Sequence, residues 1–217
     1  MRGANPSFFI FIKDFNYLRF LIRMKKRLKG VKGMAERNVG KTFEDDFKTS
    51  AKEQGIYTYR IKDLAFSQKS QNQYLTVRVK NPCDFFMFGN IKEGRGNLIG
   101  LELKSTKYSS IGFQLTANDP DAMIKHHQIE GLRELAAHEG IWAGFLFNFR
   151  HENSEETYFL DIKDFDEFLK GTTKKSINTG DIQLYDGLKI NQELKRKHYR
   201  YNVQAFIEDL AKRKGVN

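Results

Sequence analysis

The chain has 217 residues, of which 40% are hydrophobic and 29% charged, and its formal net charge is +10. This length suits one domain with a full core and is short for two, and the composition is that of a globular protein. A single cysteine, Cys83, excludes a disulfide framework within the chain and a cysteine-rich zinc site, so a reducing cytoplasm is the expected compartment.

The positive charge is concentrated at both ends of the chain. Residues 1–33 hold nine Lys and Arg against one Asp, and residues 187–217 hold eight basic against three acidic residues. Such ends suit contact with a polyanion, although basic tails also serve solubility or unspecific binding to nucleic acid. We expect a basic extension at 1–33 and one domain at 34–217, with Met34 as a candidate alternative start.

An apolar run at 8–22 raises the question of a membrane segment or a secretory signal. Lys13, Asp14 and Arg19 interrupt the run, which argues against a membrane span. Its positive charges follow the apolar residues, whereas a secretory signal places them before. A basic amphipathic helix and no membrane partner are therefore expected.

The pattern of apolar residues predicts helices and strands in alternation. In chain order we expect a helix at 41–54, strands at 56–61, 74–79, 84–88 and 98–104, a helix at 120–139, strands at 141–149 and 157–162, and helices at 164–170 and 202–213. The continuous hydrophobicity of 141–149 predicts a central strand buried on both faces. The alternation indicates an α/β fold with a mixed β-sheet.

A basic, polar stretch at 62–73 lies between two of these strands. It fits an arm projecting from the domain as well as it fits an ordinary surface loop. If it is an arm, its basic residues are candidate contacts for DNA phosphates. These residues are Arg60, Lys62, Lys69, Arg78 and Lys80.

The strongest chemical signal is Asp84 followed by the motif Leu101–Lys104. Glu102 and Lys104 are two apart on a predicted strand, so their side chains leave the same face. If the strands at 84–88 and 98–104 pair as a hairpin centred on Glu93, Asp84 lies directly opposite Glu102. Opposed residues share a face, with Cβ atoms about 4.5–5.5 Å apart.

Two carboxylates this close repel each other unless a cation lies between them. Mg²⁺ is the simplest such cation, and Mn²⁺ is expected to substitute for it. The metal would activate a water and polarise a phosphoryl oxygen, while Lys104 would orient that water or neutralise developing charge. Glu-X-Lys alone is common on solvated strands, so the upstream Asp84 is what points to phosphodiester cleavage.

From about residue 35 to 210 the sequence resembles RecU, the Holliday-junction resolvase of Gram-positive bacteria and some of their phages. The matching segments are Asn38–Glu44, Asp84, Glu102–Lys104, Phe113–Leu115, His127–Glu130 and Arg200–Asn202. The resemblance implies a restriction-endonuclease-like fold, with a mixed sheet flanked by helices. It also implies a homodimer that inserts a stalk, expected at 59–80, into the centre of a four-way junction.

The same resemblance assigns roles to individual residues. It makes Asp84 and Glu102 metal ligands and Lys104 the catalytic lysine. Glu44 resembles a helical acid that supports the metal site, and Gln128 resembles a residue that positions the lysine, the metal water or the phosphate. For Glu44 an alternative stays open, because acidic residues in a first helical turn interact favourably with the helix dipole.

One position departs from the family. RecU proteins usually carry Arg where Val39 stands, so the DNA contact expected there is either absent or made by Arg37 or Lys41.

The sequence thus predicts a Mg²⁺-dependent, structure-selective DNA endonuclease that resolves Holliday junctions in recombination and repair, with a recombinase as a candidate partner. Two alternatives remain. One is a duplex-cutting endonuclease of the same fold, and the other is a non-catalytic protein that binds junctions or regulates a recombinase. The combination of Asp84, Glu102 and Lys104 favours cutting, since a pure binder has no need of it.

Overall fold

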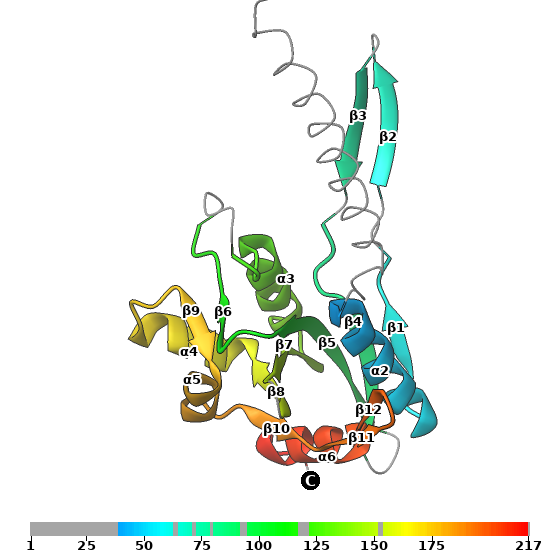
Figure 1. The fold of residues 1–217 in the computed structure, drawn as a ribbon, viewed down its shortest axis with the longest axis vertical. Coiled ribbons are helices and arrows are strands. Elements are labelled where there is room, and N and C mark those ends of the chain that lie inside the picture. The colour runs from blue at the N-terminus through cyan, green and yellow to red at the C-terminus, as the bar shows by residue number, and fades with distance from the viewer. Residues whose placement is uncertain are drawn as a thin grey trace, which may run out of the picture. The chain divides into compact units, whose positions relative to one another are not determined.

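The computed structural model describes residues 39–62, 65–70, 73–78, 80–91, 95–116, 122–151 and 154–216 (Figure 1). The predicted extension at 1–33 and the predicted DNA contact Arg37 lie outside the described residues. So do the side chains of Lys69 and Arg78.

The described residues form helices and strands in alternation, as predicted. The helices are α2 (Val39–Glu53), α3 (His126–Ala136), α4 (Ile162–Gly171), α5 (Thr179–Leu184) and α6 (Val203–Arg213). The strands are β1 (Thr58–Arg60), β2 (Ala65–Ser70), β3 (Gln73–Arg78), β4 (Phe85–Ile91), β5 (Arg95–Thr106), β6 (Ser110–Gly112), β7 (Ile141–Arg150), β8 (Glu155–Asp161), β9 (Ser176–Asn178), β10 (Leu188–Ile190), β11 (Gln192–Lys195) and β12 (His198–Tyr201).

A six-stranded sheet with the order β1-β4-β5-β7-β8-β10 is the centre of the fold. The neighbours β5 and β7 run parallel, and the other neighbouring pairs of this sheet run antiparallel. The connection between β5 and β7 contains α3, as a parallel pair requires a long crossover. A mixed sheet flanked by helices is therefore confirmed.

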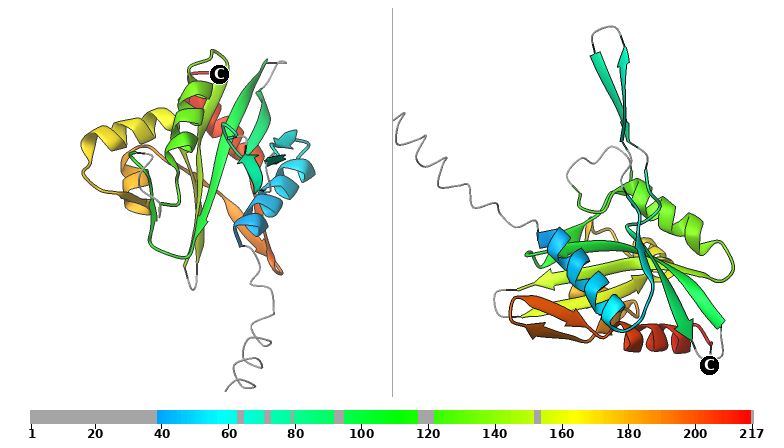
Figure 2. Two further views of the ribbon diagram at one scale, coloured as in Figure 1. Left: turned by 90° about the horizontal axis from the view of Figure 1, so that it is seen from above. Right: turned by 90° about the vertical axis from the view of Figure 1, so that its right-hand side faces the viewer.

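Helices lie on both faces of this sheet (Figure 2), and an apolar core fills the space on each face. One core joins α2 and α6 to β4 and β5, through residues such as Phe47, Ile207 and Leu101. The other joins α3 and α4 to β7, and Phe145 and Phe165 are part of it. Every residue from 142 to 149 is buried, which confirms the prediction of a central strand covered on both faces.

The predicted pairing of β4 with β5 is also confirmed. Phe85 lies opposite Leu101, Phe88 opposite Leu98 and Ile91 opposite Arg95, which is the hairpin centred on Glu93. Both strands are longer than the predicted strands at 84–88 and 98–104, since β4 ends at Ile91 and β5 begins at Arg95.

The segment predicted as an arm contains a strand that was not predicted, β2. The strands at 56–61 and 74–79 do not pair with each other, because β1 pairs with β4. The polar stretch itself supplies β2, which pairs with β3 from Ala65–Arg78 to Ser70–Gln73 as a separate two-stranded sheet. At the base of this hairpin, Asn81 Nδ2 donates a hydrogen bond to the Lys62 carbonyl at 3.3 Å.

The helix predicted at 120–139 is shorter in the structure, and α3 begins only at His126. The reason is a β-bridge between Phe113 and Ile124. The Ile124 amide donates to the Gly112 carbonyl, and its own carbonyl accepts from the Gln114 amide, both at 2.9 Å. These bonds hold the chain before His126 extended.

Helix α3 packs very closely against the segment that leads into β4. Gly131 faces Pro82, and a Cβ atom at this glycine would come within 2.6 Å of the Pro82 carbonyl oxygen and 2.7 Å of its Cα. The glycine therefore sets the distance between α3, which carries Gln128, and the strand start that carries Asp84.

We predict that Gly131→Ala destabilises the protein by about 1–3 kcal/mol, because backbone atoms of Pro82 must move to admit the methyl group. The same change at an unobstructed helical position stabilises by up to about 1 kcal/mol. Urea denaturation measures the difference. Glu134→Ala, on the exposed side of α3, is the control and should have little effect. A more stable Gly131→Ala protein would contradict the close packing.

Candidate active site

Strand β5 places Glu102 and Lys104 on the face that α3 covers. In the parallel register with β7, Glu102 lies beside Phe145 and Lys104 beside Phe147. Glu102 is only 2% exposed, and Lys104 Nζ lies 2.8 Å from Glu102 Oε1. The two side chains thus form an ion pair in which the glutamate is buried and the lysine half-buried, in keeping with the shared face predicted from their spacing.

Asp84 lies where the backbone pairing of β4 with β5 ends. Its amide donates to the Leu101 carbonyl at 3.0 Å, and its Oδ2 accepts from the Leu103 amide at 2.8 Å. The Asp84 carboxylate thus accepts a hydrogen bond from β5 just beyond the last backbone pair, close to Glu102. The predicted register of β4 and β5 is confirmed up to Phe85 and Leu101, the last pair of the ladder, and Asp84 lies near enough to Glu102 to raise its pKa.

Gln128, in the first turn of α3, contacts the same carboxylate. Its Nε2 donates a hydrogen bond to Glu102 Oε1, and its own Oε1 accepts from the Lys125 amide at 2.9 Å. Oε1 of Glu102 therefore receives both the Lys104 ammonium and the Gln128 amide. Gln128 links the N-terminus of α3 to the buried glutamate.

Glu44 reaches this region from α2, on the other face of the sheet. Its carboxylate forms an ion pair of 2.8 Å with Arg60 on β1. Burial raises the pKa of Glu44, Arg60 counteracts this, and the negative charge of Asp84 raises it further. The helix-dipole alternative is not supported, because α2 begins at Val39 and has no acidic residue in its first turn.

The electrostatics of the cluster are dominated by burial. Burial raises the pKa of Glu102 to about 8, against the stabilising Lys104 charge and with a further increase from Asp84. Cys83, next to Asp84, is 1% exposed, and burial raises its thiol pKa as well. The effect of burial on the pKa of Glu102 is therefore larger than the opposing effect of the Lys104 charge.

The donor set fits a hard divalent ion bound mainly through water. Among the described residues no group of three or more His, Cys, Asp or Glu side chains gathers around a common point. Two carboxylates, Asp84 and Glu102, do lie together, and the Leu103 amide at the same strand edge holds Asp84 in place. Mg²⁺ binds in this way, with one or two carboxylates and several waters.

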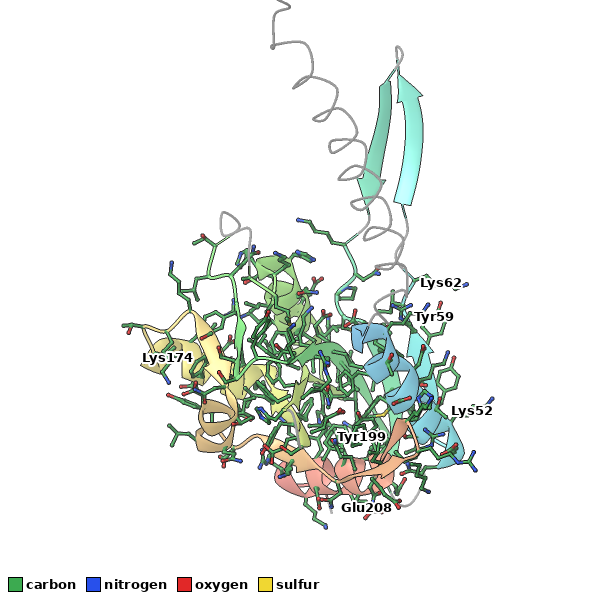
Figure 3. All side chains as sticks on the ribbon, viewed as in Figure 1. Lys52, Tyr59, Lys62, Lys174, Tyr199 and Glu208 are labelled. Atoms are coloured by element: carbon green, nitrogen blue, oxygen red, sulfur yellow. The ribbon has the colours of Figure 1, made fainter. Side chains whose placement is uncertain are left out.

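Of the predicted DNA contacts, Arg60 has a role that the sequence did not suggest. Its guanidinium is paired with Glu44 and remains 46% exposed. Lys41, Lys62 and Lys80 are exposed, and Lys62 is visible in Figure 3. No sequence pattern identified the Arg60–Glu44 pair, because it depends on β1 lying next to β4.

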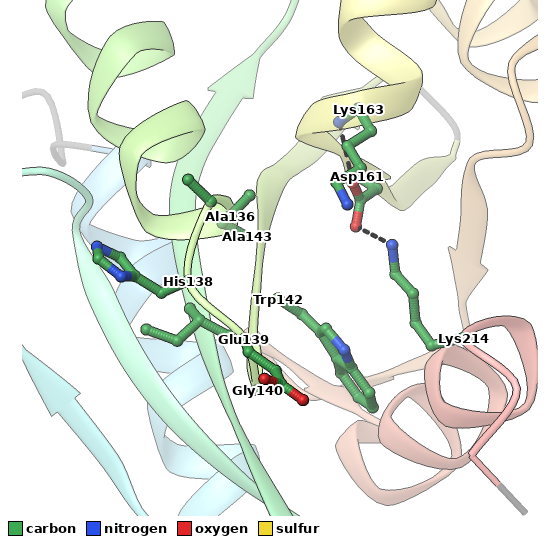
Figure 4. A pocket seen from close by; sticks show the side chains of 11 residues that line it. Ala136, His138, Glu139, Gly140, Trp142, Ala143, Asp161, Lys163 and Lys214 are labelled. Carbon is green, nitrogen blue, oxygen red and sulfur yellow. Dashed lines mark hydrogen bonds and ion pairs between the residues drawn. The ribbon is translucent and has the colours of Figure 1, made fainter.

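A hollow of about 350 Å³ lies away from these residues, between the loop after α3 and the end of β8 (Figure 4). Lys214 Nζ lies 2.7 Å from Oδ2 of the buried Asp161 on its wall, and Asp161 also caps α4 by accepting from the Lys163 amide. These contacts attach the end of α6 to α4, and none of the predicted site residues lines the hollow.

The fold and the site define a mixed α/β protein with a buried glutamate, lysine and glutamine cluster beside an aspartate at a strand edge. The chain is 32% identical over 191 residues to the SPbeta prophage-derived uncharacterized protein YotM of Bacillus subtilis (strain 168), covering 83% of this chain and 90% of that protein. The chain therefore belongs to the same family as YotM. No family model matches the chain.

Among solved structures, the chain is similar to Hjc, a Holliday junction resolvase of Archaeoglobus fulgidus. The TM-score is 0.38 and the identity 16%, over 70% of this chain and 92% of Hjc. Within the part of the chain that the structure describes, no helix combines the length and hydropathy needed to cross a membrane.

We predict that Glu102→Gln stabilises the metal-free protein at alkaline pH. Because the folded-state pKa of Glu102 lies above its ordinary value of 4.5, its contribution to stability is complete below about pH 4.5 and is lost as the pH rises towards about 8. The uncharged amide escapes this loss, so its advantage should grow over that interval to the order of a few kcal/mol.

Urea denaturation in EDTA, at about pH 5 and about pH 8.5, measures this change. Glu156→Gln is the control, because the ion pair with Lys189 lowers the pKa of Glu156 and its replacement brings no alkaline gain. An unchanged difference between wild type and Glu102→Gln at the two pH values would show that Glu102 is ionised throughout.

Proposed function

We propose that this protein is a Mg²⁺-dependent DNA endonuclease of the restriction-endonuclease-like fold that cuts four-way junctions. The observation that carries the proposal is the placement of Asp84 beside Glu102 and Lys104 by the register of β4 and β5. The sequence resemblance to RecU, in the same three residues and in Gln128, supports the choice of substrate. It also supports a role in cytoplasmic recombination and repair, with a recombinase as a candidate partner.

Each side chain has a defined task in this proposal. Asp84 and Glu102 would hold the divalent ion, which supplies an activated water and polarises the scissile phosphate. Lys104 would stabilise the negative charge that develops on the phosphate. Gln128 keeps the Glu102 carboxylate in place, and Glu44 adds negative charge from α2 while holding Arg60 at the rim.

The hairpin of β2 and β3 is the proposed stalk. It lies in the chain between β1 and β4, and its strands pair with each other rather than with the six-stranded sheet. Its base begins close to Asp84, since the Ile61 amide donates to the Asp84 carbonyl at 2.9 Å. An element joined to the site in this way would bring the centre of a branched substrate close to the catalytic residues.

The two alternatives differ from the proposal in testable ways. A duplex-cutting enzyme would use the same residues without preferring a junction. A non-catalytic binder gains nothing from Glu102, since a buried ion pair seldom stabilises a protein more than apolar residues of similar size would. The burial of Glu102 with Lys104 therefore favours an enzyme.

We predict that Asp84→Asn and Glu102→Gln each abolish Mg²⁺-dependent cutting of a four-way junction, while junction binding in EDTA persists. Lys104→Ala should lower the rate by about 10²–10³-fold, as the removal of one transition-state stabiliser does. Lys189→Ala, which removes a surface lysine paired with Glu156, is the control.

The assay compares a labelled junction with a linear duplex of the same arm sequence, with and without Mg²⁺. Equal rates on the two substrates would favour the duplex-cutting alternative. Near wild-type cutting by Asp84→Asn would show that the site is assigned wrongly, and no cutting by the wild type would favour the non-catalytic alternative.

A homodimer would supply the two active sites that symmetric cuts across a junction require. An exposed aromatic face on β1, β4 and β5 supports this part of the proposal. Tyr57, Phe86, Phe88 and Leu98 line a hollow of about 420 Å³ there. Three of the eight large hydrophobic side chains exposed among the described residues, Tyr57, Tyr59 and Phe88, belong to this face (Tyr59 is labelled in Figure 3). Such gathered exposure marks protein interfaces.

We predict that the double variant Tyr57→Lys/Phe88→Lys is a monomer, because burying two lysines in an apolar interface removes the attraction between copies. Light scattering after size-exclusion chromatography gives the mass. The control, Leu184→Lys, changes an exposed apolar residue on α5 and should leave a dimer. A dimer of the double variant would place the interface elsewhere.

A further inference from the structure

Besides the predicted DNA contacts, a group of basic residues lies at the tip of the hairpin formed by β11 and β12. Lys195, Arg196, Lys197 and His198 follow one another there, and all four are exposed. Two acidic residues nearby have basic partners. Glu193 lies 3.8 Å from Lys195, and Glu53 forms an ion pair of 2.9 Å with Arg200. Residues 195–198 together form a basic tip.

The backbone of the basic tip is unusual for its sequence. Lys195 pairs with His198, so Arg196 and Lys197 form a two-residue turn. Arg196 has a φ of 61°, whereas Lys197 has a negative φ. This pattern is that of a type II′ turn, whose first central residue is usually glycine. An arginine thus occupies a left-handed position that glycine would adopt with less strain.

Buried contacts fix the basic tip to α2. The carboxylate of the buried Asp46 lies 2.7 Å from His198 Nδ1 and accepts from the Tyr199 amide at 3.0 Å. Further along β12, the Tyr201 amide donates to Ser50 Oγ at 3.0 Å (Tyr199 is labelled in Figure 3). Because α2 also carries Glu44, the basic tip has a fixed position relative to the candidate active site.

We propose that the basic tip binds the phosphate backbone of a duplex DNA arm, as a contact separate from the active site and from the β2–β3 hairpin. Adjacent cations on a rigid support suit a polyanion, and a guanidinium can hold a phosphate with two parallel hydrogen bonds. The strained Arg196 is then retained for its side chain and not for the turn. The inference rests on the proposed function only in taking DNA as the ligand.

The test measures binding of linear duplex and four-way junction by fluorescence anisotropy, in EDTA and at several salt concentrations. Lys195→Gln/Arg196→Gly/Lys197→Gln should weaken binding of both DNAs on the order of tenfold. The salt slope should become shallower by roughly 0.9 for each phosphate that the variant no longer binds. The control Lys163→Gln/Lys175→Gln removes two exposed lysines near α4 and β9 and should keep the wild-type slope.

The single variant Arg196→Gly separates binding from stability. It should raise the melting temperature, because glycine relieves the left-handed strain, and at the same time lower DNA affinity several-fold. A basic tip that only protects the hairpin from pairing with other strands would give the stability gain with unchanged binding, and that result would overturn the inference.

The outcomes for the basic tip and for the proposed nuclease are distinguishable. Wild-type protein that binds DNA through the basic tip but does not cut in Mg²⁺ would refute the nuclease alone. Protein that cuts junctions, with tip variants that bind like the control pair, would refute the inference alone. Tip variants should still cut when protein saturates the DNA, because Asp84, Glu102 and Lys104 are unchanged.

Discussion

The hydrogen bond from the Leu103 amide to Asp84 Oδ2 is the contact on which the arrangement of the site depends. The paired residues of β4 and β5 end at Phe85 and Leu101. Beyond them the Asp84 amide still donates to the Leu101 carbonyl, and the Asp84 side chain accepts from the Leu103 amide. Strand β5 continues to Thr106 with β7 on its other side. The edge of β5 that binds Asp84 and carries Glu102 thereby lies close to Glu44 from α2 and Gln128 from α3.

The burial of Glu102 in this arrangement costs stability. Glu102 is buried among phenylalanines on β7, and its carboxylate is held by one lysine and one amide. Burial disfavours the charged form of this carboxyl group and so raises its pKa to about 8. Residues with such perturbed protonation concentrate at functional sites. The free-energy cost of burying the Glu102 carboxylate distinguishes this ion pair from the exposed ion pairs of the surface.

Local patterns were sufficient for much of the fold and for the centre of the site. The period of two along β4 and β5, with a turn between them, predicted the correct register of these strands, which brings Asp84 near Glu102, and the apolar run at 141–149 predicted the central strand. Features that depend on distant partners were not predictable. Strand β2 has no apolar alternation, the Arg60–Glu44 pair needs β1 beside β4, and the bridge at Ile124 shortens α3 against its helical pattern.

The attachment of α2 to β12 has a consequence for the order in which the chain folds. Asp46 and His198 are 152 residues apart in sequence, and contacts of such separation form late because the intervening loop must close first. During synthesis α2 emerges early, yet its buried aspartate finds its partners only after β12 has been made. Helix α2 therefore reaches its final position in a late step, and in a partly synthesised chain the Glu44 that it carries is not yet fixed near Asp84.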